Sequence, residues 1–109
     1  MHRDFKAANI LLHNSQCKIA DLGFAKQMNK LDVARTVLGS DLTKAPEVLE
    51  EKPYGFEADI WSIGVVYYQL LFGNYPYLAA TDKDILKKIK KSKPDFSKAK
   101  ISSNAQNFL

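Results

Sequence analysis

The sequence predicts a mainly α-helical domain that carries one small β-hairpin. Two short apolar runs, at residues 10–13 and 17–20, flank a short polar turn and predict the hairpin. A nearly continuous apolar stretch at 60–72 and an amphipathic stretch at 82–91 both have helical length. Of the 109 residues, 46% are hydrophobic and 26% are charged, which favours one small folded domain over a disordered or fibrous chain.

The first half of the chain predicts short elements joined by long loops. Residues 24–44 have mixed polarity without sustained periodicity, and an irregular loop of this length is usually functional. A short helix is expected over 46–49, because proline suits the first turn of a helix. Residues 51–57 contain a proline and a glycine and are expected to form the next loop.

The apolar stretch at 60–72 predicts the central helix of the domain. Asp59 is a suitable N-cap, which places the helix at about 59–72, and Gly73 is a suitable stop. Because this helix is apolar on nearly every side, we expect protein to surround it. It is shorter than the roughly 20 residues that cross a bilayer, so no transmembrane segment is predicted.

Two further helices are predicted in the second half. A lysine-rich helix is expected over about 82–91, with Thr81 or Asp82 as its N-cap. Ser102 or Ser103 is expected to cap a last helix, in which the chain stops.

The net charge of +4 comes largely from the lysine-rich part of the chain. Such a run can attract nucleic acid or anionic lipid. The apolar residues of the same helix fall on the opposite face, however, which is typical of a solvated surface helix, so no nucleic-acid partner is expected. The lysines concerned are Lys83, Lys87, Lys88, Lys90, Lys91, Lys93, Lys98 and Lys100.

Cys17 is the single cysteine and cannot form an internal disulfide, which suits a reducing compartment. It lies in a predicted strand and is interpreted as a small packing residue. Residues 1–4 lack the apolar run of a signal peptide, and a cytoplasmic location is therefore expected.

Four motifs occur in an order and at intervals that are very specific as a set. They are His-Arg-Asp-Phe-Lys-Ala-Ala-Asn at 2–9, Asp-Leu-Gly at 21–23, Ala-Pro-Glu at 45–47 and Asp-Ile-Trp-Ser-Ile-Gly at 59–64. With these motifs the chain resembles the C-terminal lobe of eukaryotic protein kinases over nearly its whole length. The resemblance implies a partial kinase domain over 1–109, with 2–9 as catalytic loop and 21–47 as activation loop, and with the N-lobe absent.

The resemblance assigns the chemistry to the first two motifs. Asp4 is implied to be the catalytic base for the substrate hydroxyl, and Lys6 to contact the transferred phosphate, a pattern of serine/threonine kinases. Asn9 and Asp21 are implied to hold Mg²⁺ together with the phosphates of ATP. Leu22 stands where these kinases usually carry phenylalanine, and it is expected to fill the same apolar slot.

A regulatory role is implied for Arg3 and for hydroxyl-bearing residues of the activation loop. In kinases with an arginine beside the catalytic aspartate, here Arg3, this side chain pairs with a phosphate on the activation loop. Thr36 is the leading phosphorylation site, with Ser40 and Thr43 as alternatives. Ser40 is also implied to bond to the side chains of the catalytic loop.

Three residues are assigned structural roles. His2 belongs to the catalytic-loop motif, and Glu47 normally pairs with an arginine farther along the C-lobe. Asp59 is expected to cap its helix and, by the resemblance, to accept backbone N–H groups of the His-Arg-Asp segment.

The resemblance departs from the usual pattern at Asp41 and Thr43, where kinases carry proline and tyrosine. These residues help to form the wall beside the phosphoacceptor, so the substrate preference is not predicted. Some short stretches of the sequence are similar to unc-51-like kinases and others to Ste20-like kinases. The sequence does not decide between these two subfamilies.

Two functions follow from these observations. The first is a serine/threonine protein kinase that transfers the γ-phosphate of ATP to hydroxyl groups of a protein substrate. The five glycines form no Gly-x-Gly-x-x-Gly loop, so the chain alone is expected to be inactive. The alternative is a truncated, non-catalytic kinase lobe that binds other proteins.

Overall fold

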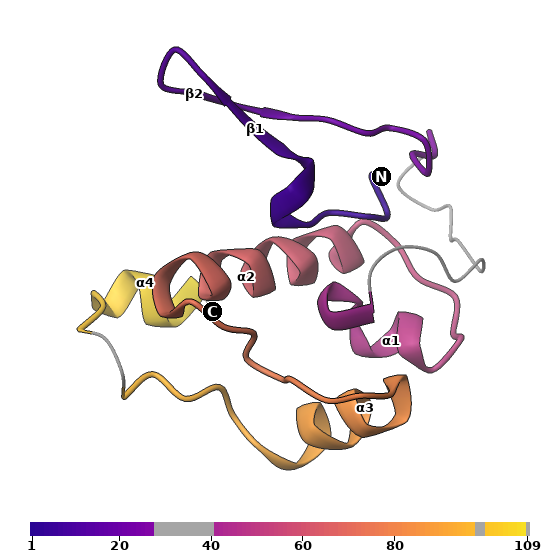
Figure 1. Cartoon of the computed structure of the whole chain (residues 1–109). Helices are drawn as coiled ribbons and strands as arrows, with labels where there is room; N and C mark the ends of the chain where they lie inside the picture. The colour runs from indigo at the N-terminus through magenta and orange to yellow at the C-terminus, as the bar shows by residue number, and fades with distance from the viewer. Residues whose placement is uncertain (28–40, 98–99, 109) are drawn as a thin grey trace.

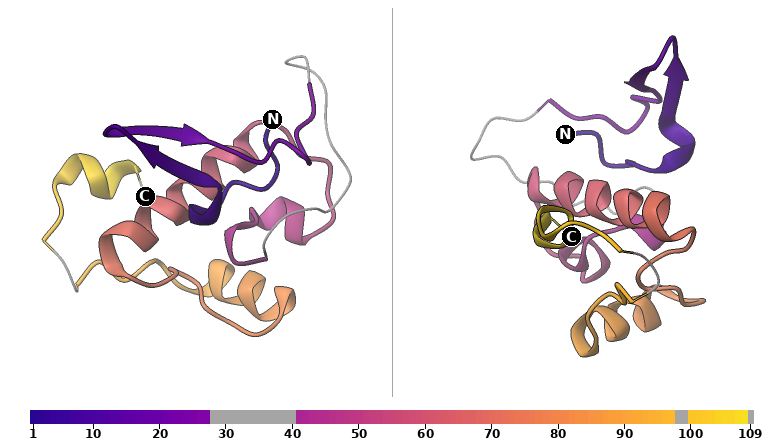
Figure 2. Two further views of the ribbon diagram at one scale, coloured as in Figure 1. Left: turned by 45° about the horizontal axis from the view of Figure 1, so that its top comes forward. Right: turned by 90° about the vertical axis from the view of Figure 1, so that its left-hand side faces the viewer.

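A computed structural model describes residues 1–27, 41–97 and 100–108. The long helix α2 runs through the middle, with the N-terminal segment and its hairpin on one side and with α1 and α3 on the other (Figure 1; Figure 2). This arrangement is mainly α-helical with one small hairpin, as predicted. The elements are the 3₁₀ turns η1 (Ala7–Asn9) and η2 (Asp41–Thr43), the strands β1 (Ile10–His13) and β2 (Gln16–Ile19), and the helices α1 (Pro46–Leu49), α2 (Glu57–Phe72), α3 (Asp82–Lys91) and α4 (Ser103–Phe108).

The hairpin pairs β1 and β2 in antiparallel register, from Ile10 opposite Ile19 to His13 opposite Gln16. The turn residues Asn14 and Ser15 have φ angles of 47° and 59°. Two-residue hairpin turns of type I′ require this left-handed conformation, which asparagine tolerates better than most residues. The two residues therefore determine the register.

Every residue of the hairpin except Ile10 is exposed, including Leu12 at 73%. Cys17 is exposed as well, so its interpretation as a packing residue is wrong. The physical reason is that neither face of this two-stranded sheet is covered within the described residues, so a strand position does not imply burial.

Helix α2 begins two residues before Asp59, and the prediction that Asp59 caps it is wrong. A turn forms earlier, in which the Ala58 amide donates to the Gly55 carbonyl at 3.2 Å. Asp59 thus becomes the third residue of the helix, and its carboxylate is used elsewhere. The predicted stop is confirmed, because Gly73 ends the helix with a φ of 74°.

Protein covers only part of α2, contrary to the expectation for so apolar a helix. Val65, Val66 and Tyr68 are buried, whereas Ile60 is 60% and Leu70 is 69% exposed. The buried side of α2 packs against the described elements, and none of these elements covers the side chains of Ile60 and Leu70.

The core on the far side of α2 from the hairpin joins α1 to the start of α2. Its buried residues are Ala45, Val48, Tyr54 and Ala58. The Ser62 hydroxyl, buried in α2, donates to the Thr43 carbonyl at 2.8 Å and to the Ala58 carbonyl at 3.0 Å. The segment before α1 is therefore held to α2 by both packing and hydrogen bonds.

The caps of the last two helices are as predicted. The Thr81 hydroxyl accepts the Asp84 amide of α3 at 3.2 Å, and the Ser102 hydroxyl accepts the Ala105 amide of α4 at 3.2 Å. Ile85 of α3 is 2% exposed and anchors this helix. Within the described residues, no helix has the length and apolar character needed to cross a membrane.

Candidate active site

The N-terminal segment is anchored to α2 by one carboxylate. The backbone amides of His2 and Arg3 donate to the two oxygens of Asp59 at 2.7 and 2.9 Å. Arg3 has a φ of 71°, a left-handed conformation that is uncommon for a residue with a side chain. The two charge-assisted bonds hold this conformation and determine where the next residue, Asp4, lies.

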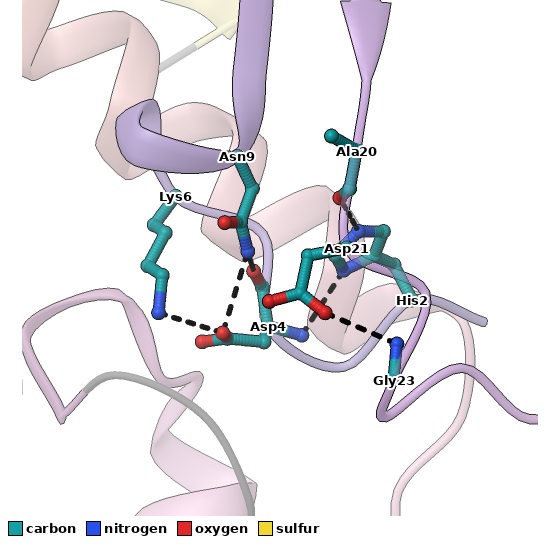
Figure 3. A network of polar contacts seen from close by, with 7 residues as sticks. All are labelled: His2, Asp4, Lys6, Asn9, Ala20, Asp21 and Gly23. Atoms are coloured by element: carbon teal, nitrogen blue, oxygen red, sulfur yellow. Dashed lines mark hydrogen bonds and ion pairs between the residues drawn. The ribbon is translucent and has the colours of Figure 1, made fainter.

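Asp4 is 3% exposed and lies at the centre of a polar network (Figure 3). Its carboxylate forms an ion pair with the Lys6 ammonium at 2.7 Å. The Asn9 side-chain amide donates to the Asp4 carbonyl at 2.9 Å and to its carboxylate at 3.4 Å. Because both partners are acceptors, the nitrogen of Asn9 must face Asp4, and its oxygen is left to point away.

The hairpin brings Asp21 back to Asn9. The Asn9 carbonyl accepts the Ala20 amide at 2.8 Å, which continues the strand pairing by one step. Asp21 follows directly, with a φ of 59°, and its exposed carboxylate accepts the Gly23 amide at 3.2 Å. Residues 12 positions apart in the sequence thus flank one end of the hairpin.

His2 links the two ends of this network. Its Nδ1 accepts the Asp4 amide at 3.3 Å, so the hydrogen of a neutral ring lies on Nε2, which donates to the Ala20 carbonyl at 3.1 Å. The ring also packs edge-on against Phe5 at 6.1 Å between centroids. His2 therefore holds the residues next to Asp21 against those next to Asp4.

Arg3 points toward the segment after Asp21. Its Nε donates to the Phe24 carbonyl at 2.5 Å. Thr36 and Ser40, two of the predicted phosphorylation sites, lie outside the described residues. Thr43, the third, is only 3% exposed, so its prediction as a phosphorylation site is wrong. Glu47 is half-buried, and within the described residues its carboxylate has no ion pair.

Asn9 and Asp21 offer only oxygen ligands, which suit Mg²⁺. The described residues contain no group of three or more His, Cys, Asp and Glu that could hold a metal ion by themselves. A pair of oxygen ligands completed by phosphates and water is the usual arrangement for Mg²⁺, so the residues present fit this ion.

Comparison with known proteins agrees with this geometry. The sequence model described as "Protein kinase domain" matches residues 1–109. The chain belongs to the protein kinase family. It is 36% identical to the serine/threonine-protein kinase atg1 of Dictyostelium discoideum and to max-2 of Caenorhabditis elegans, each over the whole chain. It is 40% identical to human serine/threonine-protein kinase ULK1 over 78% of the chain.

The chain spans only part of the length of these kinases. It covers 17% of atg1, 17% of max-2 and 9% of ULK1. The comparisons thus show the family and the serine/threonine type of its relatives.

The structure departs from the kinase resemblance at Leu22. This side chain is 67% exposed, so the expected apolar slot is not formed by the described residues. In contrast, sequence reasoning missed Ser62, which holds Thr43 and the segment before α1 to α2. A small polar residue in an otherwise apolar helix was the available signal.

Proposed function

We propose that the chain is part of a serine/threonine protein kinase that transfers the γ-phosphate of ATP to hydroxyl groups of a protein substrate. The observation that carries this proposal is the buried Asp4 carboxylate, paired with Lys6 and bonded to Asn9. A buried carboxylate within reach of a cation is suited to accept a proton while charge develops beside it. The three relatives named above are serine/threonine-protein kinases, which supports the substrate class.

Each polar residue of the site has a distinct role in this proposal. Asp4 accepts the proton of the substrate hydroxyl and orients its oxygen. Lys6, two residues away, neutralises negative charge on the transferred phosphate. The flexible side chain of Lys6 allows its ammonium group to turn from Asp4 to the phosphate. Asn9 keeps the Asp4 carboxylate in place through the two bonds of its amide nitrogen.

Asn9 and Asp21 would hold Mg²⁺ through the outward oxygen of the amide and through the carboxylate. When bound, this ion neutralises charge on the phosphates of ATP. The backbone bond between Ala20 and Asn9 positions the two ligands.

For regulation, we propose that Arg3 binds a phosphate group on the activation loop, with Thr36 as the leading site and Ser40 as an alternative or as a partner of the catalytic-loop side chains. The guanidinium of Arg3 already faces this loop through its bond to Phe24. A phosphate would add a charge-assisted bond at a residue whose backbone conformation positions Asp4.

The 109 residues alone are not expected to turn over ATP, because they contain no glycine-rich loop to cover its phosphates. A non-catalytic role in protein binding is the alternative for this polypeptide. The single cysteine fits a reducing compartment, and we place the protein in the cytoplasm.

A chimera tests the proposal. The segment of the Dictyostelium atg1 kinase that matches this chain is replaced by residues 1–109, and phosphate transfer from labelled ATP is measured on peptides with serine, threonine or tyrosine. We expect transfer to serine and threonine peptides. Asp4→Asn should reduce the rate by a factor of about 10² to 10⁴, because general-base catalysis contributes that much.

Asp95→Asn, an equally conservative change of an exposed aspartate, is the control and should leave the rate unchanged. A correctly folded chimera that shows no transfer, or one in which Asp4→Asn and the control behave alike, would contradict the proposed role of Asp4.

A further inference from the structure

Helix α3 lies on the opposite side of α2 from the hairpin (Figure 1; Figure 2). It carries a line of three exposed lysines. Lys83, Lys87 and Lys91 are spaced four residues apart and are exposed. No carboxylate of the described chain forms an ion pair with any of them. This spacing places neighbouring members of the line about 6 Å apart along the helix axis.

Other lysines of α3 are already used within the fold. The Lys88 ammonium donates to the Leu78 carbonyl at 2.6 Å, and Lys90 forms an ion pair with Glu50. The helix therefore contains two kinds of lysine, those that hold it to the rest of the domain and those that face solvent alone.

Helix stability does not explain the line of lysines. Like charges four residues apart destabilise a helix, and the line contains two such pairs, Lys83 with Lys87 and Lys87 with Lys91. Lys83 is the second residue of α3, where the helix dipole disfavours a positive charge. Only Lys91, in the last turn, interacts favourably with the dipole.

The lysines border a shallow hollow with an apolar residue among them. The hollow has a volume of about 310 Å³ and is lined by Lys83, Leu86, Lys87, Lys90 and Lys91. Leu86 is half-buried and offers a small apolar contact between the charges. This combination is complementary to a peptide that carries several carboxylates around one apolar side chain.

We propose that the α3 surface, formed by Lys83, Lys87, Lys91 and Leu86, binds an acidic peptide segment of a partner protein. A bilayer is a poorer partner, because Ile85 is 2% exposed and packs inward, which leaves the helix without an apolar face to insert. Nucleic acid is a poorer partner because α3 contains no aromatic residue on which a base could stack. The proposal is independent of catalysis and of the proposed kinase function.

Fluorescence anisotropy with the whole chain tests the proposal without ATP. The probe is a labelled peptide with three acidic residues on either side of a leucine, and the reference peptide carries Gln and Asn in place of the acids. We expect saturable binding of the acidic peptide only, weakened by salt. Replacing all three lysines, Lys83→Gln, Lys87→Gln and Lys91→Gln, should weaken binding about tenfold, since each exposed ion pair contributes modestly.

A matched variant carries Lys18→Gln, Lys26→Gln and Lys100→Gln, three exposed lysines outside α3. Both triple variants lower the net charge by the same amount, but the matched one should change the affinity less than twofold. Thermal unfolding provides a second measurement, in which the α3 variant should be no less stable than the original chain, because glutamine and lysine have similar helix propensity.

Equal losses in both triple variants, or no binding of the acidic peptide, would overturn the proposal. Destabilisation by the α3 substitutions would overturn it as well, since the lysines would then serve the fold. Competition provides a further test, with a single-stranded oligonucleotide or with vesicles of phosphatidylcholine and phosphatidylserine as competitor. If either displaces the labelled peptide at a lower concentration of negative charges than the unlabelled peptide needs, the proposal is overturned.

Discussion

The two sides of α2 are stabilised in different ways. On one side, the candidate catalytic segment, residues 2–9, is positioned by hydrogen bonds, above all those of Asp59 to the amides of His2 and Arg3, and the hairpin that follows it is exposed. On the other side, α1 and α3 are held by buried apolar residues such as Val48 and Ile85. Phe5, at 8% exposed, is the main apolar contribution to the first side.

This difference matters for the chemistry of the site. Apolar packing tolerates substitutions that conserve the volume of the side chain, whereas a charge-assisted hydrogen bond has a narrow range of length and direction. The position of Asp4 therefore depends on hydrogen bonds, above all on those of the Asp59 carboxylate, more than on the size of the core. Loss of that carboxylate should affect the two sides unequally.

The largest expected effect is that of Asp59→Ala. It removes two charge-assisted bonds, worth about 3 kcal/mol together, and leaves the amides of His2 and Arg3 without these acceptors. We expect amide hydrogen exchange in residues 2–9 to accelerate about 100-fold, while the amide of Ile85 is much less affected.

Glu57→Ala is the control, because Glu57 lies in the same first turn of α2 and does not contact the catalytic segment. Uniform acceleration of exchange on both sides of α2 after Asp59→Ala would show that the sides are not stabilised separately.

The next largest effect is expected for Val66→Ala in the buried part of α2. Val66 is 2% exposed, and its truncation leaves a cavity that should cost about 2 kcal/mol in the free energy of unfolding. Urea unfolding measures this loss. Leu70→Ala, at a position 69% exposed on the same helix, should change it by less than about 0.5 kcal/mol. Similar losses in the two variants would contradict the observed burial of α2.

The packed side was the easier one to predict from the sequence. Thr81 before an amphipathic run of helical spacing predicts the cap and length of α3, and Gly73 predicts the end of α2, because these signals are local. The start of α2 was predicted wrongly, since Asp59 is a suitable cap by residue type but bonds to amides 56 and 57 positions away. Such a partner is not visible in a local pattern.

The sequence predicts which residues form the candidate site but not how they are held. The motifs name Asp4, Lys6, Asn9 and Asp21, and the structure brings them to one end of the hairpin. The bonds of His2 to the Ala20 carbonyl and of Arg3 to the Phe24 carbonyl were not predictable. Carbonyl groups are present at every residue, so the sequence carries no signal for the one that is used.

A smaller effect is expected at the cap of α3. Thr81→Ala removes the acceptor for the Asp84 amide and should cost about 1 kcal/mol, measured by urea unfolding. Thr81→Ser keeps a hydroxyl at the same place and should restore most of the stability. If serine were no better than alanine, the methyl group of Thr81 and not its hydroxyl would stabilise the helix.

The smallest effect concerns the ion pairs of Glu50, the residue after α1, with Lys52 in the next loop and with Lys90 of α3. Hydrogen bonds from Lys52 and then Lys90, with their positive charges, lower the pKa of Glu50 from its ordinary value of 4.5 to about 2. A lowered pKa in the folded state means that the charged carboxylate stabilises the fold above about pH 4.5, and that this contribution is lost as the pH falls through about 2.

Glu50→Gln should therefore reduce stability slightly at neutral pH, and the difference from the original chain should shrink between about pH 4.5 and about pH 2. Because the lysine partners are exposed, 1 M salt should reduce the difference at neutral pH too. A difference that persists unchanged in salt and at low pH would mean that Glu50 stabilises the contact of α1 with α3 by packing. The charge of Lys90 would then contribute no more to the stability of the fold than the charges of Lys83, Lys87 and Lys91 do.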